Sequence, residues 1–231
     1  SSTAAVSMAN CAVNAMKSAM ESVWSYAPAL ADKIREEENR TDKYEDILGT
    51  YLLKLGALPL SDAESEEVTE LLKLIGDFER IGDHAVNVLE SAEELHDKKL
   101  GFSESAQHEM KTMMAALCDV LDTALRSFVN NDVESAKLVE PLEQVIDDLK
   151  RELRTRHIQR MKKGECSVEA GFVWADLLTN LERASDHCSN VALCVIDMRT
   201  HDLNLHETLT LRTHADEFDS LYKQYARKYA L

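Results

Sequence analysis

The feature that most constrains the fold of this 231-residue chain is an internal repeat. The stretch ERIGDHAVN at residues 79–87 aligns with ERASDHCSN at residues 182–190, and both share the frame E-R-x-x-D-H-x-x-N at an offset of 103 residues. At an offset of 105 residues, ENRTD at 38–42 aligns with EQVID at 143–147. Shared residues at such fixed spacing predict that one folding unit has been duplicated in tandem.

The chain between these motifs is typical of long helices. It contains only seven glycines and three prolines, aromatic residues are few, and apolar residues recur at spacings of three and four. Pro141 falls inside one predicted helix, where it should bend or loosen the early turns. The expected helices span residues 2–27, 28–55, 62–99, 104–129, 133–163, 168–199 and 207–228.

The repeat and the helices together predict an all-α fold. We expect two three-helix bundles in series, residues 1–101 and residues 102–201, followed by an appended C-terminal helix within residues 202–231. The methionines at helical spacing are expected to fill the core of these bundles.

Composition excludes several classes of function. With 42 acidic and 26 basic side chains and a formal charge of −16, the chain lacks the basic surface that a nucleic-acid partner requires. Its five cysteines form no C-x-x-C pair, which favours reduced thiols in a cytoplasmic setting. We find no run of about 18 apolar residues and no signal-peptide pattern, so no membrane span is expected in this sequence.

Four acidic pairs with the spacing E-x-x-x-D stand at duplicated positions. On a helix, residues four apart lie on one face about 6 Å apart, where two like charges cost a few tenths of a kcal/mol. A helix has no structural reason to carry this arrangement four times. The pairs are Glu38 with Asp42, Glu79 with Asp83, Glu143 with Asp147, and Glu182 with Asp186.

The acidic pairs also interrupt apolar stripes. Leu72 and Ile75 precede Glu79 on its own helix face, and Leu178 precedes Glu182 in the same way. A carboxylate that faces a bundle must be paired, protonated or bound to a metal, because desolvating a lone anion costs several kcal/mol. The two pairs of each repeat could surround one oxygen-rich site for iron, manganese, magnesium or zinc.

Neighbouring residues leave alternatives open. Arg80 and Arg183 could neutralise the carboxylates by salt bridges instead of a metal, although each points about 100° away on its own helix. The histidines that follow the aspartates could ligate or support a ligand, and the asparagines four residues beyond the aspartates could orient a carboxylate. These residues are His84, His187, Asn87 and Asn190.

The stretches LLKLIGDFERIGDHAVNVLESAEEL and HIQRMKKGECSVEAGFVWADLLTNLERASDHCSN resemble the two halves of a PhoU domain. The resemblance extends over roughly residues 1 to 200 and is strongest to the PhoU-like domain of bacterial sodium/phosphate cotransporters. It implies two tandem three-helix bundles whose E/D-x-x-x-D motifs hold multinuclear clusters of transition metal, with iron or zinc expected. Its implied ligands are Glu38, Asp42, Glu79 and Asp83 in the first site, and Glu143, Asp147, Glu182 and Asp186 in the second.

The resemblance also implies a role in restraining phosphate uptake or phosphate signalling as an adaptor and not as a catalyst. The expected partner is the membrane domain of a phosphate transporter or a phosphate-signalling protein. The chain would then act in the cytoplasm, tethered to the inner face of the plasma membrane if it belongs to a cotransporter. Whether it forms a homodimer stays open.

Two other classes of function compete with this interpretation. One is a metal-free helical scaffold whose acidic faces bind a basic partner surface. The other is a carboxylate-bridged di-iron oxidase, which needs Glu-x-x-His on two helices. Only Glu93 with His96 has that spacing, and Arg199 stands where the repeat would place the second histidine. The sequence shows no catalytic set of nucleophile, base and orienting residue, so we expect no enzyme activity.

Overall fold

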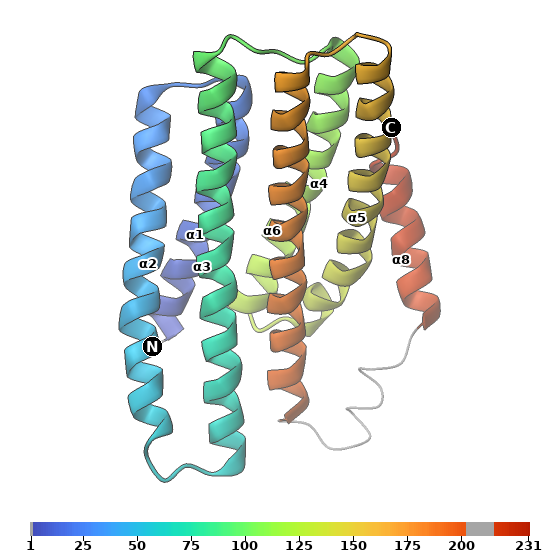
Figure 1. The fold of residues 1–231 in the computed structure, drawn as a ribbon. Helices are drawn as coiled ribbons and strands as arrows, with labels where there is room; N and C mark the ends of the chain where they lie inside the picture. The colour runs from blue at the N-terminus through green and yellow to red at the C-terminus, as the bar shows by residue number, and fades with distance from the viewer. Residues whose placement is uncertain (1, 202–214) are drawn as a thin grey trace.

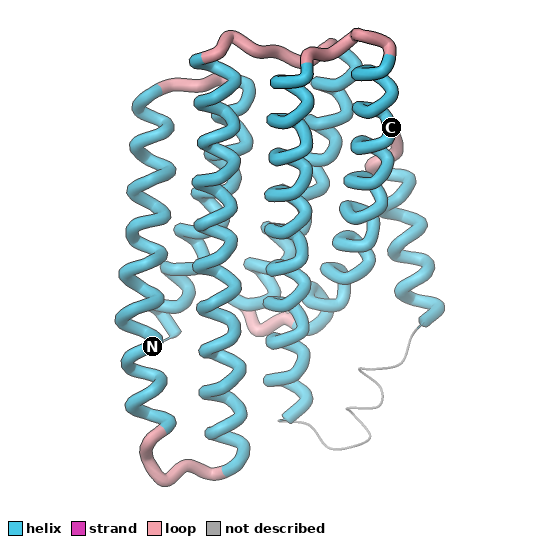
Figure 2. Tube along the Cα trace, viewed as in Figure 1, coloured by secondary structure: helices cyan, strands magenta, loops and turns pink. Residues whose placement is uncertain are grey.

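A computed structural model describes residues 2–201 and 215–231, and the described part is helical throughout its regular structure (Figure 2). The predicted all-α fold is confirmed. The helices are α1 (Ser2–Trp24), α2 (Pro28–Gly56), α3 (Asp62–Asp97), α4 (Glu104–Val129), α5 (Val133–Lys162), α6 (Val168–His201) and α8 (Ala215–Lys228). The part of the last predicted helix at 207–214 lies outside the described residues.

Helix boundaries follow local side-chain chemistry. Ser61 forms a capping box with Glu64: its hydroxyl accepts from the Glu64 N–H at 3.2 Å, and the Glu64 carboxylate accepts from the Ser61 N–H at 2.8 Å. Pro28 opens α2, where its missing N–H leaves no bond unmade. Gly164, just after α5, has φ of +72°, a left-handed conformation that glycine adopts without strain.

The helices form two three-helix units side by side (Figure 1). Within the first unit α1 packs on α2 and α3, and within the second α4 and α6 pack on α5. The units meet mainly along α3 and α6, which run antiparallel at the centre of the molecule, and α1 also contacts α4. The order of the six helices therefore matches the predicted duplication.

A single apolar core runs through both units. Methionines contribute to it as predicted: Met8, Met16, Met110 and Met113 are fully buried. Pro141 is buried inside α5, and the helix continues through it without a break. Helix α5 curves along its length (Figure 1). All five cysteines lie in the described residues, and all are free thiols.

The last helix, α8, packs on the outer side of α5 (Figure 1). The Tyr229 hydroxyl donates to Asp119 of α4 at 2.6 Å, and the Lys228 ammonium lies 3.1 Å from the same carboxylate. The appended helix is thus tied to the second unit. None of the helices in the described ranges has a stretch long and apolar enough to cross a membrane.

Candidate metal centres

In the first repeat, α2 and α3 bring five carboxylates together on one face. One oxygen each from Glu38, Asp42 and Asp83 lie within 4.8 Å of one another, and the same holds for Asp42, Glu45 and Glu79. The two groups share Asp42, so they form one continuous acidic cluster. All four residues predicted for this site belong to it.

The second repeat brings together a smaller group. Oxygens of Glu143 on α5 and of Glu182 and Asp186 on α6 lie within 4.8 Å of one another. Asp147, the fourth predicted ligand, lies outside this group, and its carboxylate is 3.6 Å from the Arg151 guanidinium. Three of the four predicted residues therefore meet in this site.

The carboxylates of both clusters are half-buried, apart from the exposed Asp83. Burial and the neighbouring Asp42 together raise the pKa of Glu38 to about 7, and burial and the neighbouring Asp83 together raise that of Glu79 to about 8. Burial and Asp186 likewise raise the pKa of Glu143 to about 8. The negative charge in both clusters is therefore poorly compensated by the protein itself, which is the condition that a bound cation relieves.

The two sites differ in one aligned position. Glu45 in the first repeat corresponds to Lys150 in the second at the offset of 105 residues. The Lys150 ammonium lies 3.1 Å from the Glu182 carboxylate, and both side chains are largely buried. The first site thus has an extra anion where the second has a built-in cation.

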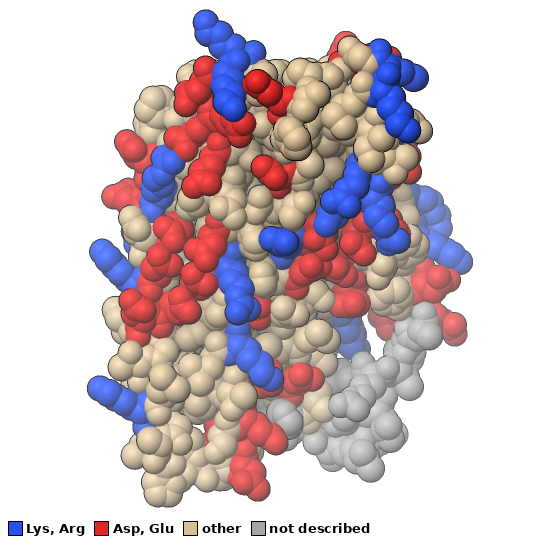
Figure 3. Space-filling view, in the orientation of Figure 1, with Lys and Arg blue, Asp and Glu red and all other residues tan. Residues whose placement is uncertain are grey.

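The two arginines of the repeated motif form no ion pair with the clusters, although the charge of Arg80 partly offsets the rise in the pKa of Glu45. Arg80 and Arg183 are exposed, and neither forms an ion pair with any residue in the described part of the chain. The salt-bridge alternative therefore fails for the arginines and holds only for Lys150 in the second site. Figure 3 shows acidic side chains gathered over α2 and α3 and again over α5 and α6.

The histidines of the repeated motif face the opposite repeat. His84 Nδ1 lies 2.9 Å from the Asn180 side-chain oxygen, and His187 Nδ1 lies 3.0 Å from the Asp77 carboxylate. Asp77 and Asn180 are themselves related by the offset of 103 residues, so the two contacts are equivalent. The imidazole rings stack with their centroids 5.5 Å apart.

The asparagines of the motif join the same contacts. Asn87 donates to Asn180 at 3.1 Å, and Asn190 donates to Asp77 at 3.2 Å. These amides therefore do not orient cluster carboxylates as expected, but form contacts between the repeats. We call this set of contacts of His84, Asn87, His187 and Asn190 with Asn180 and Asp77 the α3/α6 seam. Each motif therefore turns its acidic residues toward a candidate metal site and its His and Asn toward the seam.

Sequence reasoning missed Glu45 and Lys150. Glu45 follows Asp42 by three residues and Glu38 by seven, so helical spacing alone places all three on one face. The search for a fixed E-x-x-x-D frame passed over it. Asp77 and Asn180 were also missed, because helical periodicity predicts the face of a residue but not its partner on another helix.

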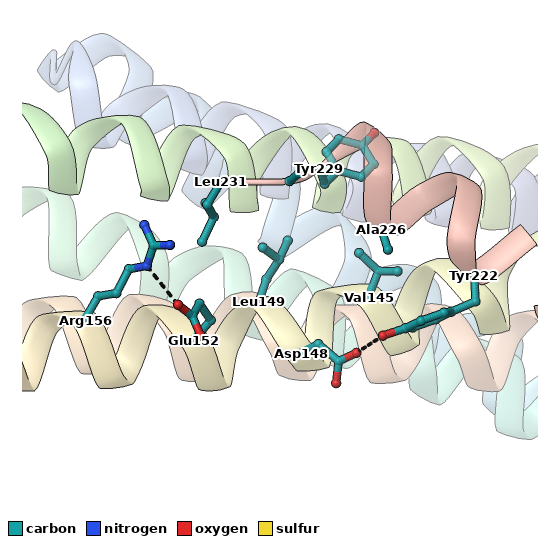
Figure 4. Close-up of a pocket in the computed structure, with 10 residues that line it drawn as sticks. Val145, Asp148, Leu149, Glu152, Arg156, Tyr222, Ala226, Tyr229 and Leu231 are labelled. Atoms are coloured by element: carbon teal, nitrogen blue, oxygen red, sulfur yellow. Dashed lines mark hydrogen bonds and ion pairs between the residues drawn. The ribbon is translucent and has the colours of Figure 1, made fainter.

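A separate cavity of about 330 Å³ lies between α5 and α8 (Figure 4). Its charged side chains are already paired, since Tyr222 donates to Asp148 and the Arg156 guanidinium donates to Glu152 at 3.0 Å. None of the predicted site residues lines it.

The fold and the two clusters define a class: a tandem pair of three-helix units with a half-buried carboxylate site on each. The sequence profile of the PhoU domain family matches residues 5–92 and 110–195, so this chain belongs to the PhoU domain family.

Known proteins similar to this chain agree with that assignment. A phosphate-specific transport system accessory protein, PhoU homolog 1 of Thermotoga maritima, is 28% identical over 80% of this chain and 79% of its own length. A PhoU homolog of Deinococcus radiodurans is 24% identical over 71% of this chain and 76% of its own length. The crystal structure of PhoU from Pseudomonas aeruginosa superposes with a TM-score of 0.79 at 20% identity, covering 85% of this chain and 94% of that one.

Proposed function

We propose that this protein is a metal-binding regulatory adaptor of phosphate uptake or phosphate signalling. The observation that carries the proposal is the pair of carboxylate clusters, each built from two helices at duplicated positions. The relatives named above support the phosphate part, because they are accessory proteins of phosphate-specific transport systems.

The donor set suits a hard or borderline cation such as iron or zinc, which accept carboxylate oxygens. Ligand oxygens within 4.8 Å of one another can converge on a single ion, and the two overlapping groups of the first repeat offer room for more than one. The bound ions would neutralise the carboxylates and hold each pair of helices together. In this role the clusters bind ions without turning over a substrate.

The proposed ligands of the first site extend the predicted set by one residue. The proposed ligands of the first repeat are Glu38, Asp42, Glu45, Glu79 and Asp83. Those of the second repeat are Glu143, Glu182 and Asp186, with Asp147 at the edge of the site.

Metal analysis of protein purified without chelator tests the metal part. Iron or zinc should be present, Asp83→Ala should reduce the first site, and Asp186→Ala should reduce the second. Glu67→Gln, an exposed substitution on α3, is the matched control and should leave the metal content unchanged. Native protein that contains no metal and takes up neither iron nor zinc would refute this part of the proposal.

The proposed partner is the membrane domain of a phosphate transporter or a phosphate-signalling protein, reached from the cytoplasmic side. The finer proposal is a sodium/phosphate cotransporter, which rests on the sequence resemblance. Co-purification of this chain with a phosphate-specific transport system and, separately, with a sodium/phosphate cotransporter distinguishes the general proposal from the finer one. If Glu79→Ala and Glu182→Ala weaken partner binding while metal content stays constant, the clusters are acidic docking faces and the metal-free scaffold is correct.

A further inference from the structure

A cluster of soft ligands lies where α5 passes into α6. The Cys166 thiol, in the connection between the two helices, has its sulfur 3.6 Å from His157 Nε2. Met161 lies one turn beyond His157 on α5. Its sulfur and His157 Nε2 both lie within 3.2 Å of the point where a Cβ on Gly171 would sit. The Met161 sulfur and the His157 nitrogen thus meet beside Gly171, in room that a larger residue there would take, and the Cys166 sulfur lies against the same nitrogen.

The spacing of the ligand atoms fits a single metal ion. An ion with tetrahedral angles, about 2.0 Å from an imidazole nitrogen and about 2.3 Å from a thiolate sulfur, holds those two atoms about 3.5 Å apart. The observed separation is 3.6 Å. A thiol is a weak donor and a weak acceptor, so the hydrogen bonds of Cys166 to His157 and, at 3.4 Å, to the Ser167 carbonyl oxygen cost little to give up when an ion binds.

The first repeat shows that packing alone does not require these residues. At the offsets of 105 and 103 residues, His157 corresponds to Leu52, Met161 to Gly56, and Gly171 to Val68. There a Cβ on Gly56 would contact Val68 at 3.6 Å, and Leu52 is buried with 4% of its surface exposed. The same place in the fold is thus filled by wholly apolar groups in one copy and by imidazole, thioether and thiol in the other.

His157 itself lacks the partners that a buried imidazole normally has. Only 3% of its surface is exposed, and its Nδ1 has no hydrogen-bond partner among the described residues. Its ring stacks on Trp174 with centroids 5.0 Å apart, which fixes the direction of Nε2 toward Cys166. A buried, oriented imidazole whose only polar contact is a thiol is an incomplete site.

The charge around the cluster favours a monovalent ion. Arg160 donates to both oxygens of Glu109, at 3.0 and 2.8 Å, and Arg156 pairs with Glu109 and Glu152, so these two cations and two anions cancel. A thiolate with a monovalent cation is then neutral as well, whereas a divalent cation would leave a net positive charge in partly desolvated surroundings. Thiolate and thioether sulfurs together select copper(I).

We propose that Cys166, His157 and Met161 form a copper(I) site that is separate from the carboxylate clusters. On binding, the Cys166 thiol releases its proton to solvent and the thiolate sulfur, His157 Nε2 and the Met161 sulfur coordinate the ion. The ion keeps its oxidation state. This inference depends neither on metal binding by the carboxylate clusters nor on the identity of the partner.

Anaerobic titration of the full chain with copper(I), in competition with a chromophoric copper(I) chelator, tests the proposal. The natural protein should hold one copper(I) ion per chain against the chelator. Cys166→Ser should lose this binding, and Met161→Leu, which keeps the volume but removes the sulfur, should weaken it. Cys118→Ser is the matched control, because Cys118 is also a half-buried free thiol, and it should bind like the natural protein.

X-ray absorption at the copper edge gives a second, independent measurement. Sulfur and nitrogen neighbours around copper in the natural protein are expected, with the sulfur signal reduced in Met161→Leu. Circular dichroism before each titration shows whether the variants are folded. Unchanged copper(I) affinity in folded Cys166→Ser, no binding by the natural protein, or coordination by oxygen alone would each overturn the proposal.

Discussion

Replacing Glu79 with glutamine should stabilise the metal-free protein at pH 8. Glu79 is half-buried beside Asp83, and burial and that carboxylate raise its pKa from 4.5 to about 8. Between these two pH values the unfolded chain has lost the proton while the folded chain keeps it. The raised pKa therefore costs folding free energy that is absent below about pH 4.5, grows as the pH rises, and levels off above about pH 8.

The structure sets the size of this effect. One pKa unit corresponds to about 1.4 kcal/mol, so the shift costs at most about 4 kcal/mol at pH 8, and solvent access to the half-buried cluster reduces this to about 2 kcal/mol. Glutamine has nearly the same shape and no charge. The gain of about 2 kcal/mol corresponds to a rise in Tm of about 4 to 8 °C for a domain of this size.

Thermal unfolding followed by circular dichroism, with chelator at pH 5 and pH 8, measures the effect. Glu79→Gln should raise Tm at pH 8 and gain much less at pH 5, while the exposed control Glu67→Gln should change neither value. With iron or zinc added, the variant should gain less stability than the natural protein, because one proposed ligand has been removed. A variant less stable than the natural protein at pH 8 without metal, or an equal gain at both pH values, would refute the reasoning.

Substitutions at three further positions probe other contacts. Lys150→Met removes the cation beside Glu182, so the metal-free protein should lose roughly 1 kcal/mol at pH 8 in urea unfolding, while the iron or zinc content of the second site rises. Asp77→Asn should be nearly neutral in the same assay, because the equivalent contact on the other side of the seam already uses an asparagine, whereas Asp77→Leu strands the His187 imidazole and should cost about 1 to 3 kcal/mol. Arg160→Met leaves the buried Glu109 carboxylate with only its longer contact to Arg156, at 3.4 Å, and should lower the free energy of unfolding by at most about 5 kcal/mol.

The repeat made the fold predictable from sequence. Once 79–87 was aligned with 182–190, the apolar spacing and the caps at Ser103 and Asp132 were enough to place six helices in two equivalent groups. The acidic pairs were found because their spacing puts both members on one helix face. Seven of the eight predicted ligands come together in the structure for that reason.

Contacts between helices could not be read from the sequence in the same way. His84 was singled out as a candidate to ligate or to support a ligand, but its partner Asn180 lies 96 residues further along the chain. Which residues of α3 and α6 meet depends on how the two units dock, and helical periodicity contains no information about that docking. The contact between Cys166 and His157 was missed for a related reason. Cys166 lies in the connection after α5, where helical spacing no longer predicts which residues of the helix it contacts.

The differences between the two repeats separate residues that serve the fold from residues that serve a site. Both repeats contribute equally to the seam, because the His and Asn of each motif contact the equivalent residue of the other repeat. This symmetry follows from the docking of two similar units. The position of Glu45 and Lys150 differs in charge, whereas the four E-x-x-x-D pairs of the two sites are acidic in both copies. In both copies this side chain lies beside the acidic residues of the site, Glu45 next to Asp42 and Glu79, and Lys150 next to Glu182. We therefore infer that this position adjusts the charge that each site presents to a cation, and that the first site, with five carboxylates and no lysine, depends more strongly on a bound metal than the second.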